Sequence, residues 1–255
     1  KIFKPCKLSM LIMRLIGNGG TNMPRGFPNP IGYFGSLRAS NTDVIIVRDI
    51  GRWFSLLGAI SARILNIRII IYSQTPLYKK YSFIRRLAMS IIMKILDAIW
   101  ITPILGDQVD AKNLPKKIFY VPFAVEIREQ ERKKESSKVK ILTIGKFVKR
   151  KNQLLLLNAI NELSNYHEKF HLTIVGEVSN HEHRKNLNIC KKFINDNNLN
   201  RRVKIVKNIP YHKIHNYYLS SDLFVLPATN EPAAISPLEA LGSGIPVICS
   251  NKNGT

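Results

Sequence analysis

Short apolar runs, many of them β-branched, alternate along the chain with longer amphipathic segments. Uninterrupted apolar runs are typical of parallel strands, because helices cover such strands on both faces. The pattern predicts strands at residues 43–47, 67–72, 98–102, 117–121, 139–144, 171–175, 203–206, 222–226 and 246–249. It predicts helices between them at residues 52–65, 78–96, 152–163, 182–195, 211–219 and 236–241. We therefore expect an α/β fold built on parallel sheets.

One polar stretch interrupts the alternation, at residues 126–138 (EIREQERKKESSK). A segment with so little apolar content is typical of a linker or an exposed turn between domains. The sequence therefore predicts two Rossmann-like, doubly wound domains, residues 1–130 and 131–255. The Gly- and Pro-rich residues 18–40 lack periodicity, and the sequence stops soon after the strand at 246–249. We expect both domains to be truncated, with apolar surface exposed beside that strand.

The composition narrows the class of protein. A hydrophobic content of 45% excludes intrinsic disorder, and no uncharged run reaches the roughly 18 residues of a membrane span. Lys and Arg number 39 against 17 Asp and Glu, a formal net charge of +22 that favours polyanions: nucleic acid, anionic lipid or phosphorylated small molecules. Three cysteines without C-x-x-C spacing indicate a reducing compartment, so we expect a cytoplasmic protein.

A proline-containing loop, EPAAISPLE at residues 231–239, follows the predicted strand 222–226. Ligands of doubly wound sheets bind beyond the carboxyl ends of strands, which is where this loop lies. Ser236 at the N-cap, Pro237 at the first helical position and Glu239 at the third are typical of a helix start, whose free amides can hold a phosphate. The alternative is that Glu239 only closes a capping box with Ser236 and that Glu231 is a solvated loop carboxylate.

A basic turn, GKFVKRKN at residues 145–152, follows the predicted strand 139–144. It places four cations between a strand and a helix start, where they would neutralise a diphosphate. The alternative is an ordinary solvated basic turn, which a chain so rich in lysine is expected to contain.

Taken in order, these motifs resemble one known family. The order is G-K-F-x-x-R-K-N, I-V-G at 174–176, S-D-L-F-V-L-P at 221–227, and E-P-x-x-x-x-P-L-E-A-L-x-x-G-x-P-V from 231. It resembles the retaining GT-B glycosyltransferases of family four (glycosyl transferases group 1), and the resemblance covers residues 139–255. The two glutamates, eight positions apart, match the E-x7-E signature of that family.

The resemblance implies roles for individual residues on the donor side. The donor diphosphate would be contacted by Lys146 and Lys151. Lys146 stands where the family usually has Arg, and a lysine lacks the bidentate fork of an arginine. Glu239 would bind the ribose hydroxyls, and Glu231 would be the catalytic carboxylate near the transferred sugar. The backbone amides of Ile235 and Ser236 would also donate hydrogen bonds to the phosphates.

On the acceptor side the resemblance is weaker. Gln74 occupies the position nearest to a histidine that many members have, and Ala234 stands where the family often has glycine. The 1–130 domain would bind the acceptor and the 131–255 domain the nucleotide sugar. Among the histidines, His181 and His183 are expected in solvated positions and not as metal ligands.

The resemblance implies transfer of a hexose-type sugar from a nucleotide diphosphate sugar to a glycan or lipid-linked acceptor in surface polysaccharide synthesis. The anomeric configuration would be retained, and neither a metal nor another cofactor is expected. One alternative is a sugar-nucleotide epimerase of GT-B type. Another is a catalytically inactive basic protein that binds lipid or nucleic acid, although the sequence carries no nucleic-acid-binding motif.

Residues 78–100 combine five cations with aromatic and apolar side chains. We expect residues 87–96 to form a helix that packs on the core. For residues 79–86 an interfacial role remains open, with Lys79, Lys80, Arg85 and Arg86 on anionic headgroups. In that case the protein would be peripheral on the inner face of the cell membrane.

Overall fold

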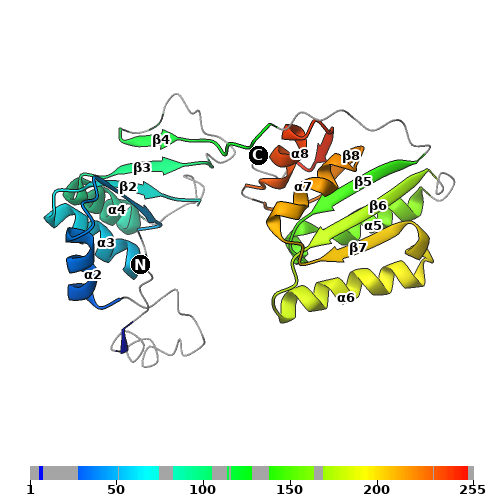
Figure 1. The fold of residues 1–255 in the computed structure, drawn as a ribbon, viewed down its shortest axis with the longest axis horizontal. Coiled ribbons are helices and arrows are strands. Elements are labelled where there is room, and N and C mark those ends of the chain that lie inside the picture. Colours follow the sequence, from blue (N-terminus) through cyan, green and yellow to red (C-terminus); the bar gives the residue numbers. More distant parts are fainter. Residues whose placement is uncertain are drawn as a thin grey trace. The chain divides into compact units, whose positions relative to one another are not determined.

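The computed structural model describes residues 6–7, 28–50, 52–74, 83–104, 114, 116–127, 138–163, 169–231 and 233–251. The chain divides into two compact units, Lys1–Pro122 and Phe123–Thr255. Each unit contains a parallel sheet with helices between its strands (Figure 1). The α/β class expected from the alternation of apolar runs is therefore confirmed.

The described strands of the N-terminal unit form one parallel sheet in sequential order: β1 (Val44–Arg48), β2 (Arg68–Tyr72), β3 (Ile99–Thr102) and β4 (Ile118–Tyr120). The same unit contains helices α2 (Pro30–Arg38), α3 (Trp53–Ile64) and α4 (Phe83–Leu96). Right-handed crossovers between sequential neighbouring strands place their helices on one face of a sheet. The three helices do lie on the same side of this sheet (Figure 1).

Small residues let α3 approach the sheet closely. Ala59 and Ala62 are fully buried and pack with Val47 of β1 and with Ile69 and Ile71 of β2. The alternate strand positions point to the other face, where Ile46 and Phe119 are exposed within the described part of the unit. The described N-terminal unit thus has a single apolar core, between the sheet and its helices.

Helix α4 is described over Phe83–Leu96. Residues 75–82, which include the start of the helix expected over 78–96, and the side chains of residues 85 and 86 lie outside the described structure. Leu96 is buried and Ile92 and Met93 pack on the core, as expected. The opposite face of the helix is apolar as well and is exposed at Leu87, Ile91 and Ile95. No described helix is long and apolar enough to cross a bilayer.

The C-terminal unit has a parallel sheet of order β7-β6-β5-β8-β9. Its strands are β5 (Val139–Ile144), β6 (Phe170–Gly176), β7 (Val203–Lys207), β8 (Leu223–Leu226) and β9 (Val247–Cys249). Its helices are α5 (Gln153–Glu162), α6 (His181–Asp196), α7 (Tyr211–Leu219) and α8 (Ser236–Gly242), with 3-10 turns η3 (Lys149–Lys151) and η5 (Leu199–Arg201).

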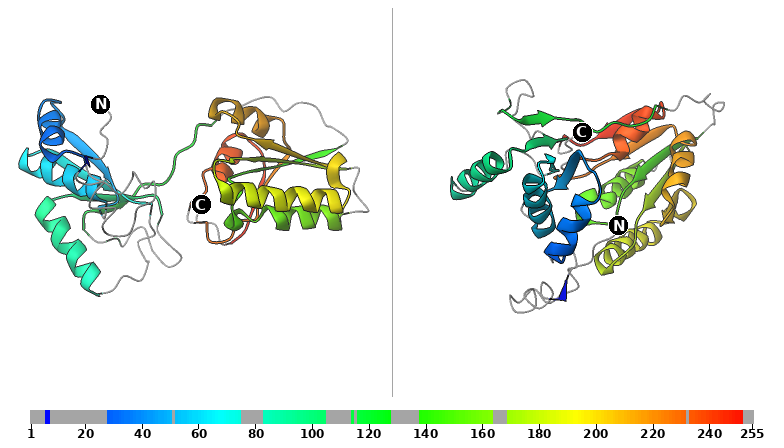
Figure 2. Two further views of the ribbon diagram at one scale, coloured as in Figure 1. Left: turned by 90° about the horizontal axis from the view of Figure 1, so that it is seen from below. Right: turned by 60° about the vertical axis from the view of Figure 1, so that its left-hand side comes forward.

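Helices cover both faces of this second sheet. Helices α5 and α6 lie on one face, and α7 and α8 lie on the other (Figures 1 and 2). Accordingly, Leu157 and Leu172 belong to one buried cluster with α6, whereas Leu142, Tyr218 and Phe224 belong to a second. Leu241 of α8 and Ile248 of β9 are exposed.

The strand order reverses direction at β5. From β5 the chain proceeds to β6 and β7 on one side and then crosses to β8 and β9 on the other. At such a switch point the loops after the two central strands diverge and leave room for a ligand at the carboxyl edge. Here those loops are residues 145–152 and residues 227–235, which carry the two motifs singled out in the sequence.

Candidate functional site

Glu231, in the loop after β8, is buried and is shared by two cations from the loop after β5. Its side chain is 5% exposed; Arg150 Nη1 donates to Oε2, and Lys151 Nζ lies 2.9 Å from the same oxygen. The backbone N–H of Thr229 also donates to the carbonyl of Arg150 over 2.7 Å, which joins the two loops. The alternatives of a solvated loop carboxylate and a solvated basic turn are therefore wrong for Glu231 and Lys151.

The charges of this cluster do not cancel. Two cations share one carboxylate, so Arg150, Lys151 and Glu231 together carry a formal charge of +1. Burial lowers the pKa of Lys151 to about 8, and the adjacent Arg150 acts in the same direction. An excess of positive charge at a strand edge, beside a buried carboxylate, is suited to binding an anion.

Two glycines fix the turn that carries these cations. A Cβ on Gly145 would lie 3.2 Å from Cδ and Cε of Lys151, so the lysine stem runs directly over the backbone. A Cβ on Gly176 would lie 2.4 Å from Cε2 of Phe147 and 2.7 Å from the carbonyl oxygen of Gly145. Phe147, fully buried, therefore packs on bare backbone at the end of β6 and anchors the turn.

Glu239, on α8, is held by two tyrosines of α7. The hydroxyl of Tyr211 donates to Oε1 over 2.8 Å, and the hydroxyl of Tyr218 donates to Oε2 over 2.7 Å. Tyr218 is buried, and burial together with the carboxylate raises the pKa of its hydroxyl. The carboxylate is thus fixed in direction by donors on a separate helix.

The predicted capping box is wrong. Ile235 is the N-cap of α8, with helical backbone angles, and Ser236 is the first helical residue. The Ser236 hydroxyl lies 3.3 Å from the carbonyl oxygen of Ile144 at the end of β5, to which it donates. No side-chain hydrogen bond caps α8, and the Glu239 carboxylate accepts from the two tyrosines of α7 instead. Glu239 is therefore oriented toward α7 and not toward its own helix start.

A cavity of about 170 Å³ adjoins Glu239 within the C-terminal unit. It is lined by residues 124–126, by α7 and by Ile235, Glu239 and Ser243. Ligand pockets usually measure roughly 300–1,000 Å³, so this cavity would take only part of a nucleotide sugar. Gly242 allows residues 124–126 to pass, since a Cβ there would lie 2.9 Å from the carbonyl oxygen of Glu126.

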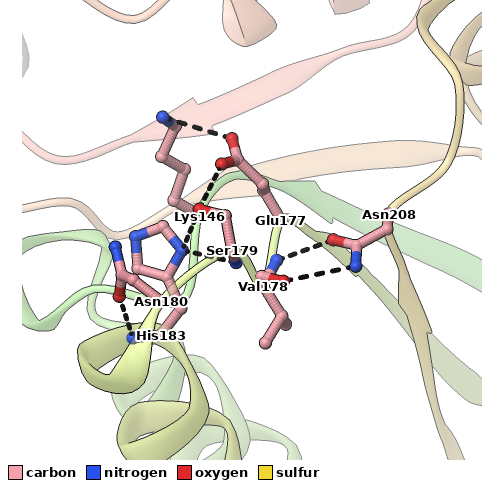
Figure 3. A network of polar contacts seen from close by, with 7 residues as sticks. All are labelled: Lys146, Glu177, Val178, Ser179, Asn180, His183 and Asn208. Carbon is pink, nitrogen blue, oxygen red and sulfur yellow. Dashed lines mark hydrogen bonds and ion pairs between the residues drawn. The ribbon is translucent and has the colours of Figure 1, made fainter.

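Lys146 lies in a separate polar network at the end of β6 (Figure 3). Its Nζ is 3.2 Å from Oε2 of Glu177, and the Ser179 hydroxyl donates to Oε1 over 2.7 Å. Hydrogen bonds from Ser179 and Lys146 lower the pKa of Glu177. The two lysines predicted to act together on a diphosphate are therefore bound to different carboxylates in this state.

His183 in the same network corrects an expectation. Its side chain is buried on the first turn of α6, and Nδ1 accepts from the backbone N–H of Ser179 over 3.3 Å. The expected solvated position is therefore wrong for His183, because Asn180 caps the helix and places the ring inside. Among the described residues, no three His, Cys, Asp or Glu side chains are grouped so that they could share a metal ion.

Gln74 lies at the carboxyl end of β2 in the N-terminal unit. Arg48 Nη2 donates to its Oε1 over 3.0 Å, and its Nε2 donates to the hydroxyl of Tyr72 over 2.9 Å. Next to it, the Ser73 hydroxyl donates to Asp49 Oδ1 over 2.8 Å. Gln74 is thus part of a polar cluster at the strand edge whose other members the sequence analysis had not singled out.

The C-terminal site also contains residues that the sequence analysis missed. Arg150 stands in the G-K-F-x-x-R-K-N motif but was given no role, and Glu177 directly follows the I-V-G motif without having been singled out. Tyr211 and Tyr218 are spaced seven residues apart on α7, which places them on one face of the helix. That spacing was the one available signal, and it is equally typical of a tyrosine that packs in a core.

Comparison with protein families decides the classification. The family model "Glycosyl transferases group 1" matches residues 125–255, slightly more than half of the chain. The chain belongs to this family. The matched region coincides with the C-terminal unit apart from its first two residues.

Individual members of the family are similar over larger parts of the chain. The capsular polysaccharide biosynthesis glycosyltransferase CapH of Staphylococcus aureus is 27% identical over 183 residues, 68% of this chain and 49% of CapH. Protein CapJ of the same species is 30% identical over 121 residues, 46% of this chain and 29% of CapJ. The chain thus spans no more than about half the length of these curated relatives.

Solved structures share the fold at low identity. A glycosyltransferase from Rickettsia africae superposes with a TM-score of 0.69 and 17% identity, covering 89% of this chain and 62% of that one. Anabaena HepE, solved in complex with UDP, superposes with a TM-score of 0.65 and 13% identity, covering 88% of this chain and 64% of HepE. These structures establish the parallel-sheet α/β architecture of the group.

Proposed function

We propose that this protein transfers a sugar from a nucleotide diphosphate sugar to a glycan or lipid-linked acceptor in surface polysaccharide synthesis. The observation that carries the proposal is the Arg150–Glu231–Lys151 cluster, with Glu231 and Lys151 buried, at the switch point of the C-terminal sheet. Family membership supports glycosyl transfer, and the name of CapH supports a capsule-like product. The proposed retention of anomeric configuration rests on the motif resemblance.

In the proposed reaction, the bond between the anomeric carbon and the diphosphate oxygen breaks, and its electron pair stays with the diphosphate. The acceptor hydroxyl oxygen bonds to the anomeric carbon, and its proton passes to the departing phosphate. Negative charge therefore develops on the diphosphate. Positively charged groups that are held in place beside it lower the energy barrier of the transfer most. Arg150 and Lys151 supply the excess charge, with Lys146 and the backbone amides of Ile235 and Ser236 as further donors.

The two glutamates would act on different parts of the donor. Glu239, whose oxygens already accept from two tyrosine hydroxyls, would accept from the ribose hydroxyls. Glu231 would lie beside the transferred sugar, where its charge and its hold on both cations position the sugar-phosphate bond. Only Glu231 is proposed as a catalytic residue.

We assign the acceptor to the N-terminal domain, residues 1–130, and the nucleotide sugar to residues 131–255. Gln74 and its partner Arg48 are the groups proposed to meet the acceptor. A lipid-linked acceptor would hold the protein at the inner face of the cell membrane as a peripheral protein. The net charge of +22 supports this location, because the cytoplasmic leaflet is anionic.

Calorimetry with UDP, GDP and ADP tests the donor site. We expect one of these nucleotides to bind and Glu239→Gln to weaken that binding at least tenfold, roughly the value of a lost charge-assisted hydrogen bond. Glu182→Gln, which removes an exposed carboxylate of the same unit, is the matched control and should leave the affinity unchanged. Equal affinity of Glu239→Gln and the unaltered protein would contradict the proposal.

A transfer assay separates catalysis from binding. Glu231→Gln should keep nucleotide affinity within about threefold but lower kcat more than about 100-fold. The substitution removes the negative charge that is proposed to act beside the transferred sugar in the transition state. The product's anomeric configuration, read by NMR, should match that of the donor. Release of free sugar with no acceptor product, or conversion of the sugar nucleotide to its epimer, would replace transfer by hydrolase or epimerase activity.

A further inference from the structure

Glu177, the first residue after β6, stands in a segment whose backbone is held on both sides of it. Its carbonyl oxygen accepts from the N–H of Phe147 over 3.4 Å, and the carbonyl oxygen of Gly176 accepts from the N–H of Asn208 over 3.0 Å. The Asn208 side chain also brackets Val178, because Oδ1 accepts from its N–H over 2.7 Å and Nδ2 donates to its carbonyl oxygen over 3.3 Å (Figure 3). The position of Glu177 is therefore fixed before its side chain makes any contact.

The start of α6 orients the carboxylate of Glu177. The Ser179 hydroxyl donates to Oε1 over 2.7 Å, and the backbone N–H of Ser179 donates to Nδ1 of the buried His183. Asn180 in turn caps the helix, since its Oδ1 accepts from the N–H of His183 over 2.9 Å. A hydroxyl has one proton, so Ser179 holds one carboxylate oxygen. The other oxygen, Oε2, faces Lys146, whose Nζ lies 3.2 Å away.

The side chain of Lys146 is the movable member of this ion pair. Its backbone is fixed, because its carbonyl oxygen accepts from the buried amide of Gln153 over 2.9 Å. The Lys146 side chain, however, is 55% exposed, and that of Glu177 is 44% exposed. An exposed ion pair is weak, and a lysine ammonium binds as a point charge without a required direction. Lys146 can therefore leave Glu177 for a stronger anion.

Lys151 of the same turn is held in a different way. Its side chain is 10% exposed, and the carboxylate that it contacts, on Glu231, is 5% exposed. Burial keeps both partners in place, whereas the partner of Lys146 lies at the surface. The turn thus contains one fixed cation and one that a ligand can draw away from its carboxylate.

We propose that Glu177 is a positioning residue, which holds Lys146 until the diphosphate of the nucleotide takes over the lysine and which takes it back when the nucleoside diphosphate leaves. A diphosphate bears more than one negative charge, so it attracts the ammonium more strongly than one carboxylate does. The inference rests on the proposed function and adds to it a residue that lowers nucleotide affinity and favours product release.

The competing carboxylate is charged under ordinary conditions. Hydrogen bonds from Ser179 and Lys146 lower the pKa of Glu177 below its usual value, so the side chain stays ionised at neutral pH. Substitution by glutamine therefore removes a real charge while it keeps an oxygen that can accept from Ser179.

Calorimetry with whichever of UDP, GDP and ADP binds tests this exchange. Glu177→Gln should raise nucleotide affinity about three- to fivefold, the strength of an exposed ion pair. In the Lys146→Met background the same substitution should leave affinity unchanged, because no ammonium remains to be held. Glu182→Gln, which removes an exposed carboxylate from the first turn of α6, is the matched control and should have no effect.

Three results would overturn the inference and leave the proposed function standing. Equal affinity of Glu177→Gln and the unaltered protein would show that no competition occurs, and weaker binding would show that the carboxylate supports the nucleotide directly. A gain that persists in Lys146→Met would be a general effect of charge. Absence of nucleotide binding from the unaltered protein and every variant would instead contradict the proposed function, and the exchange with it.

Ser179→Ala provides a second variant in case the first one misfolds. It keeps both charges but frees the carboxylate, so affinity should rise by less than in Glu177→Gln, and the change should vanish when the two are combined. Product inhibition by the nucleoside diphosphate should strengthen by the same factor as binding. A purely structural role of Glu177 would instead lower the unfolding temperature, read by circular dichroism, and weaken nucleotide binding in both variants, which would overturn the inference.

Chemical labelling gives a readout that needs no nucleotide. Acetylation by an N-hydroxysuccinimide ester, followed by mass spectrometry, should modify Lys146 faster in Glu177→Gln, because the ion pair no longer covers the amine. Lys192, exposed on α6, is the internal control and should react equally in both proteins. Equal labelling of Lys146 would show that the ion pair does not form in solution and would overturn the inference.

Discussion

The two parallel sheets differ in how they are covered. In the C-terminal unit helices pack on both faces, and each face has its own buried cluster. In the described N-terminal unit one cluster lies between the sheet and α2, α3 and α4, and Ile46 and Phe119 on the other face are exposed. Double coverage fixes the loops at a sheet edge more firmly, because each central strand is held from two sides.

The polar groups at the two carboxyl edges differ in the same way. Glu231 and Lys151 of the C-terminal unit are nearly buried and bound to each other, as a preorganised charge site requires. Arg48 and Gln74 of the N-terminal unit meet in an exposed hydrogen bond that can rearrange at little cost. The comparison indicates that the proposed nucleotide site is rigid and that the proposed acceptor site is adaptable.

Separating the units should have the largest effect. Residues 123–255 expressed alone should unfold cooperatively and bind nucleotide within about threefold of the full chain, because every donor-side group proposed lies in them. Residues 1–122 alone should bind at least about 100-fold more weakly. Calorimetry and circular dichroism measure both properties. Nucleotide binding that requires both units would show that the donor site is shared and not built by one sheet.

The sequence predicted the fold well because strands covered on both faces read as continuous apolar runs. The strands at 139–144 and 222–226 differ from the observed β5 and β8 by at most one residue at an end. Periodicity could not show which side of α4 is covered, since Leu87, Ile91 and Ile95 are as apolar as Ile92 and Leu96. Burial by a neighbour depends on tertiary contacts, which a single helix does not encode.

The candidate site was predicted only where a motif carried it. Glu231, Glu239 and Lys151 stand in recognisable patterns, and the structure places each at the carboxyl edge of the C-terminal sheet. The partners were missed because they come from other segments: Tyr218 reaches Glu239 across 21 residues of sequence, and Arg150 reaches Glu231 across 81. The local spacing of Ser236 and Glu239 also left open a capping box, which the structure does not form.

Core substitutions in the two units should separate stability from nucleotide binding. Phe147→Ala should lower the free energy of unfolding of the C-terminal unit by about 3–5 kcal/mol and weaken nucleotide binding, because Phe147 anchors the turn of Lys151. Ile71→Ala, equally buried in the N-terminal unit, should cost that unit about 2–5 kcal/mol and leave nucleotide binding unchanged. Denaturant titration with calorimetry checks both. Similar losses of nucleotide binding would mean that the units are not independent.

Substituting the two tyrosines at Glu239 should change nucleotide affinity in different directions or by different amounts. Tyr218→Phe removes the buried donor to Oε2 and should weaken nucleotide binding about tenfold, since a hydrogen bond to a charged group contributes about 1.5–3 kcal/mol. Tyr211 is 75% exposed, and its hydroxyl occupies the oxygen that a ribose would use. Tyr211→Phe should therefore leave the affinity unchanged or raise it. Equal weakening by both would show that neither oxygen is free for the nucleotide.

Nucleotide binding should weaken at high pH through Lys151. Its pKa is lowered to about 8, and only its protonated form attracts a diphosphate. Affinity should be nearly constant below about pH 7, be about halved at about pH 8 and be about tenfold lower by about pH 9. Lys151→Arg keeps the charge, so its affinity should stay constant to pH 9.5.

The lowered pKa of Lys151 also predicts how the free energy of unfolding changes with pH. Between pH 8 and the ordinary lysine value of 10.5, the unfolded chain binds more protons at this residue than the folded chain. The contribution of Lys151 to the free energy of unfolding should therefore rise with pH in that interval. Comparing the unaltered protein with Lys151→Met by denaturant titration isolates it. A contribution that falls with pH would show that Glu231 holds the lysine charged.

The smallest effect is expected at the exposed edge of the N-terminal unit. Gln74 accepts a solvent-exposed hydrogen bond of 3.0 Å from Arg48. Loss of this hydrogen bond should weaken acceptor binding by about 1 kcal/mol. Gln74→Ala should raise KM for the acceptor about fivefold, with kcat and nucleotide affinity unchanged. Asn188→Ala, which removes an exposed amide from α6, should change none of these. A fall in nucleotide affinity in Gln74→Ala would place this edge at the donor, and the contrast between a rigid donor site and an adaptable acceptor site would be lost.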